Sequence, residues 1–68
     1  MDPNSFLSSE VSVKLNDGSF IVGQLSSLDG YMNVVISNAK ELSASREEVK
    51  SHKETFIRGN NVLYVAKS

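Results

Sequence analysis

The sequence contains no cysteine and a single histidine, His52. Without cysteine the chain has no disulfide and no thiolate metal site, and one imidazole with no second histidine argues against a structural zinc site. No apolar run approaches the roughly 18 residues of a membrane span, and the N-terminus carries neither the basic nor the apolar segment of an export signal. These absences predict an intracellular protein with no metal or other cofactor and no membrane contact.

The chain also lacks an excess of charge of one sign. Its formal net charge is -1, and its 40% hydrophobic and 22% charged residues are ordinary for a globular protein. A near-neutral chain does not bind polyanions through a large net positive charge. At 68 residues it forms a single domain over residues 1–68. The hydrophobic core of so small a domain rarely contributes a net stabilisation of more than about 3 to 5 kcal/mol. Since no disulfide or metal supplements that core, oligomerisation or unusually good packing is expected to do so.

Short stretches of alternating apolar and polar residues account for most of the sequence. Each has the period of a half-buried strand, and turn residues such as Asp17-Gly18 and Asp29-Gly30 separate some of them. Gly23 lies inside the second stretch, where glycine permits a sharp bend or a close backbone approach. We therefore expect that strand to curve strongly. The stretches comprise residues 11–15, 19–28, 34–42, 51–57 and 61–66.

The remaining segments complete an all-β plan with one short N-terminal helix. Asp2 and Pro3 are typical of a helix start, which predicts a helix over residues 3–8. Residues 43–50 carry charges of both signs and no strand pattern, so we expect a solvated, variable loop there. Five strands close most economically as a small, strongly bent antiparallel barrel, because closure hides edges that a flat sheet would expose.

Two polar turns between these strands are candidates for a binding site. Residues 29–33 contain Asp29, Tyr31 and Asn33, and the second turn contains Arg58. If the turns share one end of the barrel, a nucleobase could stack between Tyr31 and Arg58 while the Asn33 amide contacts its edge. Asp29 would then orient the Asn33 amide or pair with Arg58.

The same residues are also typical of turns without a binding function. Asp-Gly is ordinary hairpin chemistry, a tyrosine at a strand start usually packs, and an exposed Asp–Arg pair is usually weak. On spacing alone this structural interpretation is the commoner one. His52 and the charged residues of the 43–50 loop receive no functional role for similar reasons.

The sequence resembles the Sm and Sm-like (LSm) family in two separate motifs. Residues 13–18 (Val-Lys-Leu-Asn-Asp-Gly), 23–25 (Gly-Gln-Leu) and 29–33 (Asp-Gly-Tyr-Met-Asn) resemble the first motif, in a region spanning residues 10–42. Residues 56–65 (Phe-Ile-Arg-Gly-Asn-Asn-Val-Leu-Tyr-Val), in a region spanning residues 51–66, resemble the second. Within the family, these sequence segments look most like the sixth LSm subunit type. The Sm F type comes next, although it typically has cysteine at the position of Gly59.

The resemblance implies a ring of usually seven subunits, joined through the edges of the fourth and fifth strands. It implies that other LSm or Sm subunits and single-stranded, uridine-rich RNA are the partners. The RNA-contacting positions would be Tyr31 for stacking, Asn33 for the base edge and Arg58 with Gly59 as the opposite wall. Asp29 would act as the supporting carboxylate. Asn60 would make a lesser contact. The chain departs from the family in the short connection between residues 6–7 and the first strand.

The function implied by the resemblance is noncatalytic RNA binding. Such rings hold the 3′ end of a spliceosomal small nuclear RNA in the nucleus, and a related cytoplasmic ring acts in messenger RNA decay. An Sm F-type subunit, a small barrel used only as a protein adaptor and a general single-strand binder remain as alternatives. No carboxylate pair, nucleophile with a base or phosphate-binding loop is evident in the sequence, so we expect no enzymatic activity.

Overall fold

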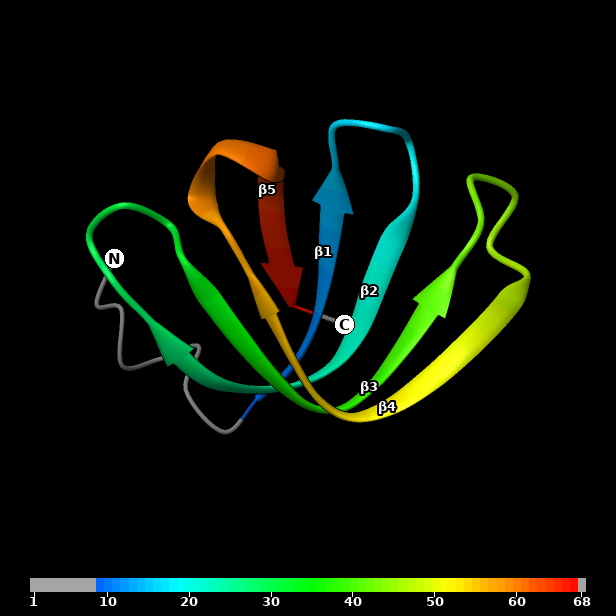
Figure 1. Cartoon of the computed structure of the whole chain (residues 1–68), viewed down its shortest axis with the longest axis horizontal. Helices are drawn as coiled ribbons and strands as arrows, with labels where there is room; N and C mark the ends of the chain where they lie inside the picture. The colour runs from blue at the N-terminus through cyan, green and yellow to red at the C-terminus, as the bar shows by residue number, and fades with distance from the viewer. Residues whose placement is uncertain (1–8, 68) are drawn as a thin grey trace.

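The computed structural model describes residues 9–67, and these form five strands and one short 3-10 turn. Figure 1 shows the strands as one strongly bent sheet in which β2, β3 and β4 curve around the molecule. The predicted helix over residues 3–8 lies outside the described residues. The elements are β1 (Glu10–Leu15), β2 (Phe20–Leu28), β3 (Val34–Leu42), β4 (Glu48–Ile57), η2 (Gly59–Asn61) and β5 (Val62–Lys67).

The sheet is antiparallel, and its strand order β4-β3-β2-β1-β5 leaves β4 and β5 at the two edges. The first four strands therefore follow one another as a meander, and β5 returns to pair with β1. The predicted turn after β1 is confirmed, since Gly18 has a φ of 93° and its N–H donates to the Leu15 carbonyl at 3.0 Å. This φ lies in the left-handed region that favours glycine.

Gly23 produces the expected bend in β2. Its φ is 156°, and a Cβ built there would lie 2.6 Å from Ile36 Cγ2 and 2.8 Å from the Ser37 carbonyl oxygen. The β2–β3 register shifts at the same place, between Val22 and Gln24. The backbone of β3 thus approaches β2 more closely than any side chain at position 23 would allow, and the sheet folds over at this point.

The core is one cluster of buried apolar side chains from neighbouring strands. Val11 and Val13 of β1, Leu25 of β2 and Ile36 of β3 are at most 1% exposed. The buried residues come from β1, β2, β3 and the end of β4, and apolar positions far apart in the sequence form one contiguous cluster. The other members of the buried cluster are Ile21, Val34, Ala39 and Ile57.

Strand β4 starts earlier than its sequence suggests. The expected loop over residues 43–50 is shorter, because β4 begins at Glu48 and pairs with β3 through Leu42↔Glu48 and Glu41↔Lys50. The residues at the start of β4 are exposed, so this edge strand has no apolar alternation there to reveal it. Backbone pairing to β3, and not side-chain burial, defines these first positions.

Within the described range, residues 9–67, no helix is long and apolar enough to cross a membrane. The same residues contain no cluster of three or more histidine, cysteine, aspartate or glutamate side chains that could hold a metal ion.

Candidate nucleic-acid interface

The two turns predicted as a binding site contact each other in the folded chain. The Gly59 N–H donates a 2.7 Å hydrogen bond to Asn33 Oδ1, across 26 positions of sequence. Figure 1 shows the turn after β4 between the β2–β3 connection and the first hairpin. The polar residues of both turns are therefore gathered at one end of the sheet.

Asp29 organises the first of these turns. Its Oδ1 accepts the backbone N–H groups of Tyr31 at 2.8 Å and Asn33 at 3.0 Å. Its Oδ2 accepts a 3.0 Å hydrogen bond from Asn33 Nδ2. Because a carboxylate only accepts hydrogen bonds, it holds the amide with its nitrogen toward Asp29 and its oxygen toward Gly59. Of the two roles expected for Asp29, the structure shows the orientation of Asn33.

These hydrogen bonds also favour the charged form of Asp29. The Asn33 side chain, followed by the Asn33 and Tyr31 backbone N–H groups, lowers the pKa of this carboxyl below its ordinary value of 3.8. Hydrogen bonds donated to a carboxylate stabilise its negative charge and disfavour protonation. Asp29 thus remains an acceptor throughout the neutral range, and the turn keeps its shape there.

Gly59 permits the close approach of the two turns. A Cβ at this position would lie 1.8 Å from the Tyr31 carbonyl oxygen and 3.1 Å from the Met32 carbonyl carbon. No side chain fits in that space without backbone movement. Met32 itself has a φ of 64°, a left-handed conformation that costs a non-glycine residue energy. This backbone conformation could not be predicted, since Met is not a typical left-handed residue.

Asn33 keeps hydrogen-bonding capacity after these contacts. Its amide has two N–H donors and two acceptor lone pairs, of which Asp29 uses one donor and Gly59 one lone pair. One donor and one acceptor remain in a fixed orientation. A planar group that offers a donor beside an acceptor matches the edge of a nucleobase.

Tyr31 lies two positions before Asn33, Arg58 directly precedes the Gly59 that donates to Asn33, and both are exposed. The Tyr31 side chain is 85% exposed, which leaves its ring available for stacking. Arg58 precedes η2, and its carbonyl accepts the Asn61 N–H at 3.0 Å. No carboxylate among residues 9–67 forms an ion pair with the Arg58 guanidinium.

The second turn is also held from the opposite side by Asn16. Asn16 Nδ2 donates to the Asn60 carbonyl at 2.8 Å, and the Asn16 N–H donates to the Asn61 carbonyl at 3.0 Å. In the sequence, Asn16 belongs to the first Sm motif over residues 13–18, and no pattern there links it to the second turn. Its contact with Asn60 spans 44 positions, so only the folded arrangement reveals it.

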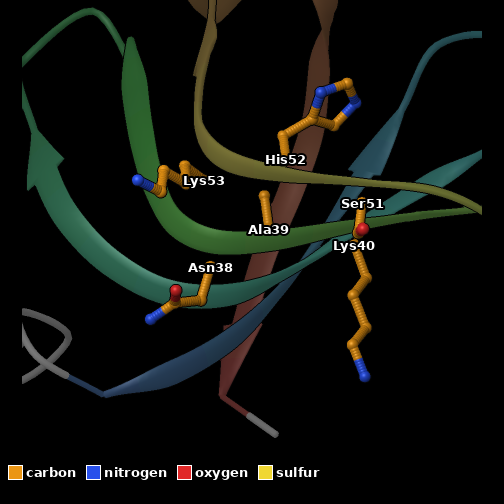
Figure 2. A pocket seen from close by; sticks show the side chains of 6 residues that line it. All are labelled: Asn38, Ala39, Lys40, Ser51, His52 and Lys53. Carbon is orange, nitrogen blue, oxygen red and sulfur yellow. The ribbon is translucent and has the colours of Figure 1, made fainter.

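A surface hollow lies elsewhere, across β3 and β4. It encloses about 420 Å³ and is lined by Asn38, Ala39, Lys40, Ser51, His52 and Lys53. Figure 2 shows Lys40 and His52 pointing to opposite sides of the paired strands. His52 Nε2 lies 3.6 Å from Glu41 Oε1. Because the lining side chains do not converge, the hollow offers no coherent ligand site.

The sequence matches the LSM domain over residues 2–67. This chain belongs to the LSM-domain family. The predicted resemblance to Sm and LSm proteins is confirmed, and the bent five-stranded sheet is the fold of that family.

Relatives of known sequence and structure cover nearly the whole chain. The U6 snRNA-associated Sm-like protein LSm6 of Pyricularia oryzae is 45% identical over 71 residues, which cover 98% of this chain and 84% of that protein. The Pyrococcus abyssii Sm protein in complex with a uridine heptamer superposes with a TM-score of 0.92 at 30% identity, covering 100% of both chains. A heptameric archaeal Sm protein superposes with a TM-score of 0.86 at 28% identity, covering 96% of this chain and 93% of that one.

Proposed function

We propose that this LSM-domain protein is a noncatalytic ring subunit that binds uridine-rich single-stranded RNA. The observation that carries the proposal is the network in which Asp29 and Gly59 fix the Asn33 amide between two turns. Such a fixed amide, two positions after the exposed Tyr31 and bonded to the glycine that follows the exposed Arg58, is suited to one unstacked base. The similar Pyrococcus abyssii protein in complex with a uridine heptamer supports uridine as that base.

Each site residue has a distinct part in this proposal. The Tyr31 ring stacks on one face of the base, and Arg58 with Gly59 forms the opposite wall. Asn33 contacts the base edge, and Asp29 holds Asn33 in position. Asn60 makes a lesser contact from the same turn, which the hydrogen bond from Asn16 Nδ2 to the Asn60 carbonyl holds in place. Stacking of this kind contributes about 1 to 3 kcal/mol per base and needs little net charge.

The edges of the sheet supply the proposed ring contacts. Among residues 9–67, strands β4 and β5 each pair with one neighbouring strand, and both expose large apolar residues. Phe56 on β4 is 63% exposed and Leu63 on β5 is 59% exposed. An unpaired edge with apolar side chains favours pairing with another subunit. The heptameric archaeal Sm relative supports a seven-membered ring, which we propose to contain other LSm subunits.

The name of the fungal relative supports a role with U6 small nuclear RNA. We propose that the ring holds the uridine-rich 3′ end of this RNA during pre-mRNA splicing, in the nucleus. Action of a related cytoplasmic ring in messenger RNA decay belongs to the same proposal, and it would place the chain in both compartments.

The test is the binding of oligouridylate and oligoadenylate to the assembled ring. Asn33→Ala and Arg58→Ala are each expected to weaken oligouridylate binding roughly tenfold, as the loss of one base contact would. Lys53→Ala, which removes an exposed cation from β4 away from the turns, is the matched control for Arg58. Unchanged uridine affinity in both site variants would remove the mechanism. A stable ring that binds neither oligonucleotide would favour the protein-adaptor alternative.

A further inference from the structure

The connection between β3 and β4 is a small closed loop over residues 43–47. The Ser43 N–H donates to the Glu47 carbonyl and the Arg46 N–H donates to the Ser43 carbonyl, both at 2.8 Å. The Glu47 N–H donates to Ser43 Oγ at 3.2 Å. Ser45 lies at the exposed tip, where its hydroxyl is 2.9 Å from Ser43 Oγ and donates to Glu47 Oε1 at 3.2 Å.

The residues around Ser45 have an asymmetric charge pattern. Glu47 and Glu48 follow it at the second and third positions and are both exposed, whereas residues 42–44 carry no basic side chain. Arg46 follows directly, so the segment lacks the proline that a proline-directed kinase needs. An acidic flank on the C-terminal side complements a kinase with a basic substrate groove. We propose that Ser45 is a phosphorylation site for an acid-directed serine kinase.

The fold distinguishes Ser45 from other serines with a similar flank. Ser26 and Ser51 each precede an acidic residue by three positions, Asp29 and Glu54 respectively. Ser26 lies inside β2 and Ser51 inside β4, where it is paired with Lys40. A kinase must hold its substrate segment in its own groove, which would require separating those strands. The 43–47 loop carries Ser45 outside the strands, so only the Leu42↔Glu48 pair at the base of the loop has to open for a kinase to hold Ser45 and Glu48.

The transfer uses ATP as the phosphoryl donor. Ser45 Oγ forms a bond to the γ-phosphorus while the bond between that phosphorus and the β–γ bridging oxygen breaks. ADP leaves, and the hydroxyl proton passes to the catalytic carboxylate of the kinase. No oxidant or other reactant is required.

Phosphorylation would weaken the closed form of the loop. The phosphate removes the donor that Ser45 presents to Glu47 and places about two negative charges beside that carboxylate. The same loop carries Arg46, whose guanidinium lies 4.2 Å from the centre of the Phe20 ring. Lys14 Nζ lies 4.2 Å from the same ring and donates to the Gly18 carbonyl at 3.0 Å. Opening of the loop would therefore detach Arg46 from the first hairpin.

The first experiment treats the full-length protein with ATP, Mg²⁺ and casein kinase 2, and locates the phosphate by fragmentation of the tryptic peptide covering residues 41–46. The expected result is one phosphate, on Ser45. Ser45→Ala is expected to abolish incorporation, whereas Ser51→Ala leaves it unchanged. Glu48→Gln is expected to lower the initial rate roughly tenfold, because it removes a charge that the basic groove recognises.

A second measurement follows the loop itself. Amide hydrogen exchange of Arg46 and Glu47 is expected to accelerate in the phosphorylated protein, and the Phe20 ring resonances are expected to shift, while the Gly59 amide is unaffected. Phosphate on Ser43 or Ser51, no incorporation, or a rate insensitive to Glu48→Gln would overturn the assignment of the site. Unchanged exchange in a stoichiometrically phosphorylated sample would overturn the opening of the loop.

Discussion

Asp29 and Asp17 are two exposed carboxylates that organise turns in similar ways at different places. Asp29 accepts the N–H groups of Tyr31 and Asn33, and Asp17 accepts the Ser19 N–H at 2.9 Å and the Ser19 hydroxyl. Hydrogen bonds lower the pKa of both carboxyls. Only Asp29 contacts the amide that we propose reads the base, so the two residues form a matched pair for mutation.

Asp29→Asn is expected to weaken oligouridylate binding roughly tenfold, because its new NH2 group would face the NH2 group of Asn33 and leave that amide without a fixed orientation. Asp17→Asn is expected to leave the affinity unchanged. Fluorescence anisotropy with a labelled oligouridylate measures both. Equal losses in the two variants would mean that Asp29 acts through general turn stability alone.

The lowered pKa of Asp29 predicts the direction of its pH dependence. A carboxyl whose folded pKa lies below its unfolded value stabilises the fold above the unfolded value, and that contribution is lost as the pH falls through the folded pKa. The Tyr31 and Asn33 amide resonances are therefore expected to stay constant near neutral pH and to titrate together with a midpoint below the ordinary pKa of 3.8. NMR titration tests this, and a midpoint above that value would contradict it.

Gly59 and Gly30 provide a second matched pair. Gly59→Ala places a Cβ 1.8 Å from the Tyr31 carbonyl oxygen, whereas a Cβ at Gly30 meets no atom within 4 Å. We expect Gly59→Ala to reduce the free energy of unfolding by about 1 to 3 kcal/mol and to weaken uridine binding, because the turns must separate. Gly30→Ala should be close to neutral in both. Chemical denaturation and anisotropy measure the two effects, and equal behaviour of the variants would contradict the close-approach argument.

At the level of the strands, the bend of β2 depends on one backbone position. Gly23→Ala is expected to reduce the free energy of unfolding by about 2 to 4 kcal/mol, because the new Cβ meets the Ser37 carbonyl and Ile36 Cγ2 at a strained φ. Thermal unfolding of the variant, compared with Gly30→Ala, tests the prediction. A melting temperature close to that of the parent chain would show that β3 can move away at little cost.

The strands themselves were largely predictable because burial of one face leaves a period of two in the sequence. This signal fails at Glu48 and Val49, which are exposed and owe their strand conformation to pairing with β3. The candidate site was also predictable only in part. Local turn chemistry pointed to Asp29 and Asn33, but the Asn33–Gly59 hydrogen bond depends on how the whole sheet bends, which spacing does not reveal. The Asn16 contact with the second turn was missed for the same reason.

At the scale of the whole molecule, the small core and the two sheet edges can be explained together by assembly into a ring. The buried cluster draws on β1 to β4 alone, and among residues 9–67 β4 and β5 each pair with one neighbour and expose large apolar side chains. Pairing of these edges between subunits would supply the support that a 68-residue chain without cysteine lacks. A ring would also repeat the base site, so that several weak contacts act together on one RNA strand.

Phe56→Lys tests this dependence of RNA binding on assembly. A charged side chain on the exposed edge of β4 disfavours edge-to-edge pairing, so the mass in solution is expected to fall from that of a ring toward that of a single chain. Ser27→Lys, on the exposed surface of β2, is the control and should leave the mass unchanged. Light scattering coupled to size-exclusion chromatography measures both.

The same variant separates the pocket from the ring. Phe56 makes none of the hydrogen bonds that hold Asn33, so the Gly59 amide resonance is expected to keep its position in Phe56→Lys. Affinity for a long oligouridylate should nevertheless fall by at least about a hundredfold, since the gain from linked sites disappears with the ring. A dissociated variant that retained the parent affinity would show that one subunit suffices for binding, and a ring of unchanged mass would show that β4 is not the edge that joins the subunits.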